Sequence, residues 1–281
     1  MRHVLLHGHI FKNAGTTLDW SLQQSFGEAF LDHREDRLMR LQGRDHLEQL
    51  LAQNPGLAAV SSHHMTGDLP AIDGVNLVSV NLLRHPLLRI RSVYDFERKQ
   101  KGDTPGAKAA AAMGFKDYVA WRMQPDVART IRNYQTLYLA GCHQSVDNAD
   151  IADRYFGQVL ERLQAGALIG VVERYDESMV VLESELRPLF PSIDLSYVAQ
   201  NVSSRRNPGE EDGDLAAATL AELGDLALLV IDENSCDLAL YQLGRRQLQA
   251  RIEAIEDFPA RLADFRGRLK QKSGGFLSRF T

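Results

Sequence analysis

Short apolar runs alternate with longer segments of helical periodicity along most of this chain. Four of these runs are predicted strands, namely Val4–Leu6, Leu57–Ser61, Leu77–Leu83 and Ala167–Val172. Between them apolar residues recur at helical spacing, as in the series Leu18, Leu22, Phe26 and Phe30. Strands that alternate with helices pair in parallel, and the helices cover both faces of the sheet. The chain is therefore predicted to be an α/β protein with a central parallel sheet flanked by helices.

The length and composition favour one domain followed by a helical tail. The chain has 281 residues, of which 44% are hydrophobic and 25% charged, as is ordinary for a globular protein. No linker rich in Pro, Gly or Ser divides it. We expect one domain over residues 1–245 and a helical C-terminal tail over residues 246–281, broken near Pro259. The apolar stripe of this tail is expected to pack on its own domain or to join two copies in a homo-oligomer.

Three other stretches are expected to lie outside the sheet. Residues 32–54 have the composition of a charged surface helix. Residues 102–114 are small and flanked by glycines, which predicts a loop. Residues 201–214, which contain Asn, Ser, Pro and Gly, are predicted to form a second loop.

Charge and apolar content limit the partners of the chain. Its net charge of −5 argues against a sequence-independent nucleic-acid binder, which carries a basic excess. A small anionic ligand needs only a few local cations and backbone amides. The N-terminal apolar run is short and interrupted at His7, and no other stretch approaches the ~18 apolar residues of a membrane helix. We therefore expect a cytoplasmic protein with no transmembrane segment.

The most informative segment follows the first predicted strand and reads H-I-F-K-N-A-G-T-T from His9 to Thr17. A strand that enters a glycine-containing turn and then a helix N-terminus directs backbone amides at an anion, and the helix dipole favours negative charge there. Lys12 adds a positive charge, and the two threonines add hydroxyl donors. The spacing differs from the G-x-x-x-x-G-K-[ST] pattern of nucleotide triphosphatases, because Lys12 precedes Gly15 by three residues.

A second basic segment follows the third predicted strand. It contains Arg84, Pro86, Arg89, Ser92 and Tyr94. Proline suits the first turn of a helix, so the arginine stands at a strand end and the serine two turns into the next helix. The planar guanidinium group of arginine binds phosphate through two hydrogen bonds. Because ligands of parallel sheets bind at the carboxyl ends of the strands, this segment and the lysine loop are expected to converge.

These two segments resemble those of the carbohydrate sulfotransferases that use 3′-phosphoadenosine 5′-phosphosulfate (PAPS), including the heparan sulfate 2-O-sulfotransferase-like enzymes. The first matches the pattern H-x-P-K-T-A-G-T-S at His9, Lys12, Ala14, Gly15 and Thr16, whereas Phe11 and Asn13 replace its proline and first threonine. The second matches R-x-P-x-x-R-x-x-S-x-Y. Weaker similarities lie at residues 133–136, 170–175, 201–206 and 237–241. The resemblance therefore extends from about residue 3 to about residue 245.

The resemblance implies a P-loop-like sulfotransferase fold, PAPS as co-substrate and adenosine 3′,5′-bisphosphate (PAP) as product. It also implies a hydroxyl-bearing, carbohydrate-like acceptor. The residues that it assigns to nucleotide binding are Lys12, Asn13, Ala14, Gly15, Thr16, Thr17, Arg84, Ser92 and Arg205. Lys12 is also expected to be catalytic, since it can neutralise the oxygen that leaves with the nucleotide.

A histidine pair follows the second predicted strand, in the segment S-S-H-H-M-T-G from Ser61 to Gly67. It resembles the family segment S-G-H-x-x-x-G, which implies that His63 is the general base. The unperturbed pKa of histidine, near 6.5, suits that role. Alternatively, both histidines are polar loop residues. A metal site built from His7, His9, His63 and His64 is also conceivable, but their spacing matches no recognised zinc motif, so no metal is expected.

The leading hypothesis is thus in-line transfer of a sulfuryl group from PAPS to an acceptor hydroxyl. One alternative is an ATP-dependent phosphotransferase of P-loop type. The lysine spacing and the lack of an obvious carboxylate at a strand end for Mg²⁺ argue against it. Another alternative, from a different class of protein, is a catalytically inactive nucleotide-binding partner. The presence of His63 argues against that one.

Overall fold

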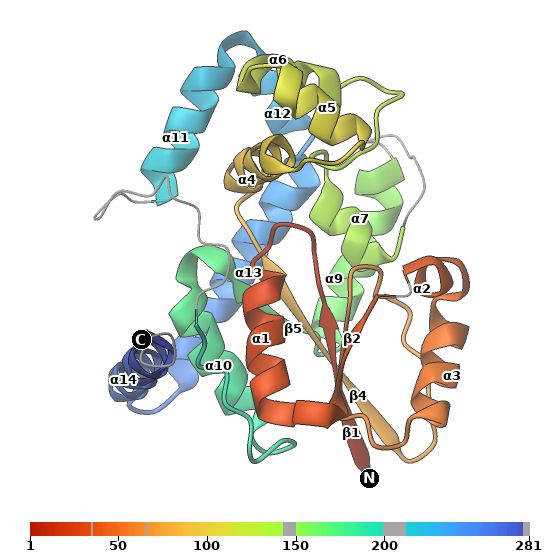
Figure 1. Cartoon of the computed structure of the whole chain (residues 1–281), viewed down its shortest axis with the longest axis vertical. Coiled ribbons are helices and arrows are strands. Elements are labelled where there is room, and N and C mark those ends of the chain that lie inside the picture. Colours follow the sequence, from red (N-terminus) through yellow and green to blue (C-terminus); the bar gives the residue numbers. More distant parts are fainter. Residues whose placement is uncertain (35, 66, 143–149, 199–211, 278–281) are drawn as a thin grey trace.

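The computed structural model describes residues 1–34, 36–65, 67–142, 150–198 and 212–277 (Figure 1). The described residues form a five-stranded sheet in the order β2-β3-β1-β4-β5, and all its strand pairs are parallel. The strands are β1 Arg2–Gly8, β2 Phe30–His33, β3 Ala59–Ser62, β4 Val75–Leu83 and β5 Leu168–Val171. The predicted α/β class with a central parallel sheet is confirmed.

Strand β1 lies at the centre and fixes the register of the sheet. It pairs with β4 along its whole length, from Arg2 opposite Val75 to Gly8 opposite Asn81. Residues 4–8 are all buried, as expected for a parallel strand covered on both faces. Because the strands are parallel, the segments that leave β1, β3 and β4 emerge at the same edge of the sheet.

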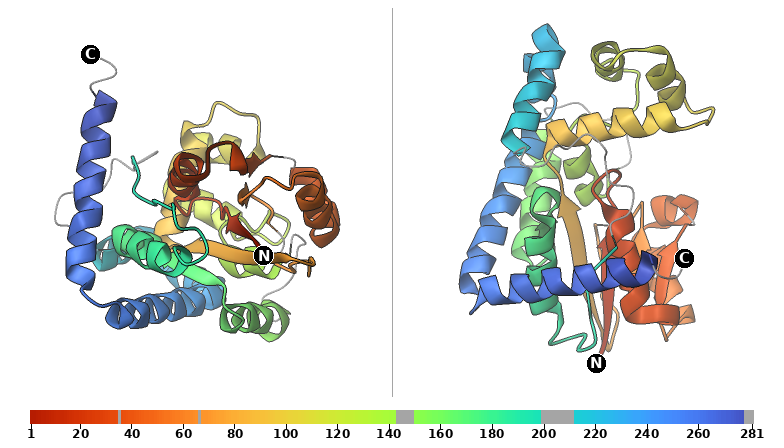
Figure 2. Two further views of the ribbon diagram at one scale, coloured as in Figure 1. Left: turned by 90° about the horizontal axis from the view of Figure 1, so that it is seen from below. Right: turned by 60° about the vertical axis from the view of Figure 1, so that its left-hand side comes forward.

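Helices cover both faces of the sheet (Figures 1 and 2). Around the sheet lie α1 Gly15–Phe26, α2 Asp36–Gln42, α3 Arg44–Gln53, α7 Tyr134–Ala140, α9 Phe156–Gln164, α10 Tyr175–Leu186 and α13 Ser235–Ala254. Short helical turns lie at Gly27–Ala29, Ile151–Tyr155, Val172–Arg174 and Gly224–Leu226. Adjacent residues of β5 point to opposite faces of the sheet. Gly170 packs against α10 on one face, and Ile169 packs against Gly244 of α13 on the other. The packing at Gly170 leaves no room for a Cβ atom.

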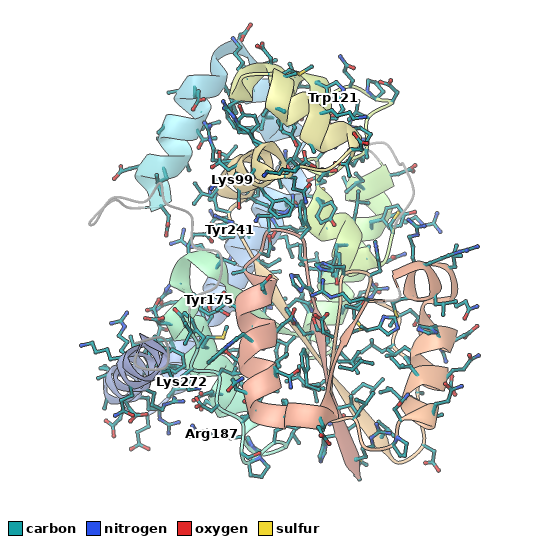
Figure 3. All side chains as sticks on the ribbon, viewed as in Figure 1. Lys99, Trp121, Tyr175, Arg187, Tyr241 and Lys272 are labelled. Atoms are coloured by element: carbon teal, nitrogen blue, oxygen red, sulfur yellow. The ribbon has the colours of Figure 1, made fainter. Side chains whose placement is uncertain are left out.

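A second group of helices, here called the helical cap, lies beyond the carboxyl ends of the strands (Figures 1 and 2). It consists of α4 Pro86–Lys99, α5 Pro105–Ala112, α6 Phe115–Arg122, α11 Asp212–Leu223 and α12 Ala227–Asp232. These helices enclose their own hydrophobic cluster, which includes Tyr94, Tyr118 and Val230. Trp121 lies among these helices, and Lys99 lies closer to the sheet (Figure 3). The cap therefore limits the space above the predicted ligand edge.

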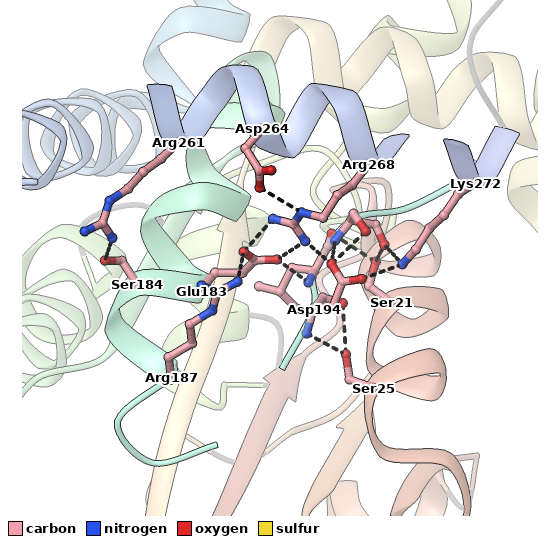
Figure 4. A network of polar contacts seen from close by, with 12 residues as sticks. Ser21, Ser25, Glu183, Ser184, Arg187, Asp194, Arg261, Asp264, Arg268 and Lys272 are labelled. Atoms are coloured by element: carbon pink, nitrogen blue, oxygen red, sulfur yellow. Dashed lines mark hydrogen bonds and ion pairs between the residues drawn. The ribbon is translucent and has the colours of Figure 1, made fainter. Parts of the chain in front are cut away.

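The C-terminal tail packs on the chain's own domain. Phe265 of α14 Phe258–Leu277 is fully buried in the main core. Arg268 pairs with Glu183 of α10 at 2.8 Å and with Asp194, and Lys272 binds Asp194 at 2.9 Å (Figure 4). This is the first of the two arrangements expected for the tail. The expected boundary after residue 245 falls inside the continuous helix α13.

Four local predictions are wrong, wholly or in part. The helix expected over residues 32–54 is divided, because residues 32 and 33 end β2 and because Gly43, with a φ of 48°, separates α2 from α3. Of the loop expected over residues 201–214, residues 212–214 begin helix α11, and residues 201–211 lie outside the described residues. The predicted loop at 102–114 contains helix α5, because Thr104 accepts a hydrogen bond from the amide of Ala107 at its N-terminus and alanines continue it. Phe30, expected to extend the first helix, starts strand β2 instead. Helix α1 ends at Phe26 because Gly27 adopts a φ of 54°, which breaks the helical path.

Candidate functional site

The loop between β1 and α1 is shaped to face an anion. Lys12 and Ala14 have φ angles of 66° and 59°, in the left-handed region that L-residues rarely adopt. Such alternating backbone conformations form concavities lined by N–H groups, and the first amides of α1 have no acceptor within the helix. Gly15 is required here, since a Cβ atom would lie 2.3 Å from the ring of His9. Strained backbone of this kind is typical of ligand-binding loops.

The side chains of this loop divide into two groups. Thr16 is exposed at the start of α1, whereas Thr17 is buried. Asn13 is also buried and donates from Nδ2 to the carbonyl of Leu82 and to Oε1 of Gln135, both at 2.7 Å. The side chain of Asn13 therefore anchors the loop to the protein, and its backbone amide donates to the carbonyl of Ile10 at 3.1 Å.

The Lys12 ammonium group lies in a positively charged environment. Its Nζ atom lies 4.3 Å from the centre of the Phe96 ring on α4. Burial, followed by repulsion from Arg84 and Lys99, lowers its pKa to about 8. A bound phosphate or sulfate group would relieve that repulsion and favour the charged amine. A lysine whose pKa is lowered by burial and by nearby cations is typical of a site that binds an anion.

Arg84 brings the second motif to the first. Its Nη1 atom donates to the carbonyl of Lys12 at 2.9 Å, and its Nε atom lies 3.9 Å from Oε1 of Glu173. Ser92 is half-buried on α4, which begins with Pro86 as expected. The structure thus joins the lysine loop to the arginine at the end of β4. Arg205, also expected at the nucleotide, lies outside the described residues.

Glu173 contacts both the side chain of Arg84 and the backbone of His85. Its carboxylate accepts from the amide of His85, at 3.1 Å to Oε1, where α4 begins. Burial raises the pKa of Glu173, although Arg84 opposes this shift. Burial also raises the pKa of Tyr241, which hydrogen-bonds to Glu173. Residues from two of the weaker sequence similarities therefore meet beneath Arg84.

His63 lies beside the lysine loop with its tautomer fixed by its neighbours. Nδ1 faces the carbonyl oxygen of His9 at 3.2 Å, and Nη1 of Arg34 donates to Nε2 at 3.3 Å. A carbonyl can only accept and a guanidinium can only donate, so Nδ1 carries the hydrogen and Nε2 the lone pair. The ring centres of His63 and His9 are 4.0 Å apart. The ring of His63 is thereby oriented at the edge of the loop, with Nε2 as its acceptor atom.

His9 belongs to a buried cluster that also contains His7 and Asp19. The two oxygens of Asp19 lie 2.7 Å from Nδ1 of His7 and from Nδ1 of His9. Burial alone would raise the pKa of Asp19, but the two histidines hold it well below its usual range. The potential ligand atoms of these three residues lie within 4.8 Å of one another, as a metal site would require. In the structure the same atoms are joined by hydrogen bonds.

The sequence did not reveal the structural roles of Asp19, Gln135 and Asp237. Asp19 looked like an ordinary residue near the start of a helix, and it proves to connect His7 with His9. Gln135 and Asp237 lay within the weaker similarities, but nothing in those patterns indicated what they contact. Gln135 contacts both the lysine loop and the backbone of Arg84, and Asp237 accepts hydrogen bonds from the amides of residues 135 and 136.

The described residues define an α/β protein with a parallel sheet and a lysine-containing loop at the carboxyl ends of its strands. No protein-family model matches the chain. A protein of Archaeoglobus fulgidus, described only as uncharacterized, is 29% identical to it over 206 residues, which cover 72% of this chain and 80% of the relative. Within the described residues, no helix has the length and apolar character needed to cross a membrane.

Proposed function

We propose that this chain is a PAPS-dependent sulfotransferase that acts on a hydroxyl of a carbohydrate-like acceptor. The observation that carries the proposal is the hydrogen bond from Arg84 to the carbonyl of Lys12, at 2.9 Å. It joins the segment that resembles a 5′-phosphosulfate loop to the segment that resembles a 3′-phosphate grip. A nucleotide with phosphate groups at both positions would match this pair of cations.

The loop between β1 and α1 stabilises the leaving group of the proposed reaction. As the bond between sulfur and the bridging oxygen breaks, negative charge collects on the 5′-phosphate of the nucleotide. The Lys12 ammonium group and the first amides of α1 are the donors available there. Thr16, exposed at the same turn, can donate its hydroxyl to a sulfuryl or phosphate oxygen.

The acceptor side belongs to His63. The acceptor oxygen forms the new bond to sulfur, and its hydroxyl proton passes to Nε2, which carries the lone pair. In the free protein Arg34 occupies that lone pair. The Arg34 side chain is 62% exposed, so it can swing away when the acceptor hydroxyl replaces it as donor. His63 leaves the step as an imidazolium ion, and PAP leaves with the former bridging oxygen.

The phosphotransferase alternative requires a carboxylate that is free to hold Mg²⁺ near the phosphates. Three buried carboxylates near the described loops have other partners. Asp19 binds two histidines, Glu173 binds Arg84 and the amide of His85, and Asp237 binds the amides at the start of α7. This arrangement favours sulfuryl transfer, which needs no metal, over phosphoryl transfer from ATP.

The proposal is tested by incubating the protein with PAPS and a panel of glycans and detecting sulfated products by mass spectrometry. His63→Ala should lower turnover by ~10²–10⁴, as for loss of a general base, and leave PAP affinity nearly unchanged. His64→Ala is the matched control and should cost much less. A crippling effect of His64→Ala alone would transfer the base role to His64. Absence of any sulfated product, together with absence of PAP binding, would refute the function.

A further inference from the structure

Gln135 is a buried glutamine that contacts both nucleotide-binding segments. It stands at the start of α7, and its side chain is fully shielded from solvent. Oε1 accepts from Nδ2 of Asn13 at 2.7 Å and from the backbone amide of Arg84 at 2.9 Å. Nε2 donates to the carbonyl of Arg84 at 2.9 Å. One side chain thus binds the lysine loop and both backbone polar groups of Arg84.

The orientation of this amide group is determined by its neighbours. The Arg84 amide can only donate and the Arg84 carbonyl can only accept, so the two ends of Gln135 cannot exchange places. Nε2 also lies 3.4 Å from Oδ2 of Asp237. Exchange would set two donors and two acceptors against each other in a buried site, which is costly. Gln135 therefore holds the two segments in one fixed arrangement.

The first turn of α7, which carries Gln135, is itself held by buried hydrogen bonds. Asp237 of α13 accepts from the amides of Gln135 and Thr136, at 3.0 and 2.7 Å, and from the Thr136 hydroxyl at 2.8 Å. The amide of Asp237 in turn donates to Oδ1 of Asn133 at 3.0 Å. These four residues are all almost completely buried. The arrangement fixes the first turn of α7 to α13, so Gln135 has little freedom to move.

We propose that Gln135 is a positioning residue that sets the separation between the 5′-phosphate loop and the 3′-phosphate arginine. It thereby makes the site selective for nucleotides that carry phosphates at both positions. The identity of the ligand rests on the function proposed above, whereas the locking of the two segments stands on the contacts alone. A ligand with one phosphate uses one segment and gains little from a fixed separation. A bisphosphate uses both and gains the full benefit of preorganisation.

The test compares the affinities of PAP and adenosine 5′-monophosphate by calorimetry for the unmodified protein and for Gln135→Met. Methionine keeps the length of the side chain and removes all of its hydrogen bonds. We expect PAP affinity to fall ~10–100-fold, and monophosphate affinity to fall much less, so the ratio of the two affinities should collapse. Thr219→Val is the control: it removes a buried hydroxyl that donates to the carbonyl of Leu215 at 2.8 Å within helix α11, away from both segments, and it should keep the ratio.

Hydrogen exchange in the ligand-free proteins gives a readout independent of nucleotide. Gln135→Met should accelerate exchange both in residues 9–14 and at Arg84, while Thr219→Val should not. If neither segment loosens, the proposal is overturned whatever the affinities are. If both loosen but the affinity ratio is unchanged, the selectivity role is overturned. If the unmodified protein binds no adenosine phosphate, the sulfotransferase function fails, and the exchange result alone decides whether the segments are locked together.

Gln135→Glu provides a second variant in case the methionine protein does not fold. Its ionised carboxylate still accepts from Asn13 and from the Arg84 amide, but it repels the Arg84 carbonyl and Asp237. Protonation restores a donor toward that carbonyl. PAP affinity of this variant should therefore recover, relative to the unmodified protein, as the pH falls. No recovery in a folded protein would contradict the donor role assigned to Nε2.

Discussion

The pKa of Lys12 makes nucleotide binding depend on pH in a way that can be calculated. Burial and the nearby cations lower this pKa to about 8 in the free protein, and a bound anion should raise it again. The binding strength contributed by the charged amine is therefore complete only well below pH 8, and it is lost as the pH rises through 8 and above. For a group with a pKa of about 8, roughly a tenth is neutral at pH 7, half at pH 8 and nine tenths at pH 9.

These fractions translate directly into affinity. If only the protonated form binds well, PAP affinity should be weakened about twofold at pH 8 and about tenfold at pH 9, relative to its value at low pH. Binding at pH 8 should also take up about half a proton. The phosphate groups, whose second pKa is near 6, are about nine tenths ionised at pH 7 and almost completely ionised at pH 8 and 9, so they contribute little to the change between pH 8 and 9. Calorimetry at pH 7, 8 and 9, in two buffers of different ionisation enthalpy, measures both quantities.

Two variants separate Lys12 from other titrating groups. Lys12→Arg keeps its charge throughout this pH range and should bind PAP with an affinity that is independent of pH between 7 and 9. Lys12→Met should bind more weakly at pH 7 and should also lack the pH dependence. If Lys12→Met retains the loss of affinity between pH 8 and 9, another group is responsible and the reasoning about the loop is wrong.

Four further predictions concern ligand choice, metal, backbone and tail. PAP at 100 times its dissociation constant should stabilise the fold by ~2.7 kcal/mol, and Arg84→Ala should remove most of the preference for PAP over ATP in a thermal-shift assay. Dialysis against EDTA should leave sulfation activity unchanged, and co-purified zinc that is lost in Asp19→Ala would contradict this. Ala14→Gly should raise the unfolding free energy by up to ~1 kcal/mol, because its φ of 59° suits glycine; denaturant titration measures it. Removing the residues after Ala254 should lower the thermal midpoint, because the truncation takes the buried side chains of Phe258 and Phe265 out of the core and exposes the apolar surface that they cover.

The sheet could be predicted wherever the sequence contained a continuous apolar run. Strands β1, β3, β4 and β5 all coincide with such runs, because they are covered on both faces. Strand β2 was missed since it has only four residues and includes Asp32 and His33. A short edge strand with polar residues carries no periodicity that distinguishes it from the helix before or after it.

The meeting of Lys12 and Arg84 could be anticipated because both follow parallel strands, and parallel strands end at one edge. The supporting residues could not. Gln135 binds Asn13 across 122 positions of sequence, and Asp237 binds Gln135 across 102. Such contacts depend on how α7 and α13 pack beside the sheet, and neither helix carries a local sequence signal of its partner.

The polar residues at this edge divide by where their hydrogen-bonding groups are directed. Those of Asn13, Gln135, Glu173 and Asp237 bind backbone amides or carbonyls inside the protein. Lys12 and Thr16 have groups that can still reach a ligand, and Nε2 of His63 accepts from Arg34, whose side chain is largely exposed. The first set satisfies buried backbone that would otherwise be costly, and in doing so it fixes the positions of the second. The sequence motifs at this edge therefore contain two kinds of residue: some position the loops, and others can contact a ligand. Substitutions in the two sets should have different effects on binding and activity. Changes at Lys12 or His63 should alter charge or proton transfer at one point, whereas a change at Gln135 should alter how two distant points act on the same ligand.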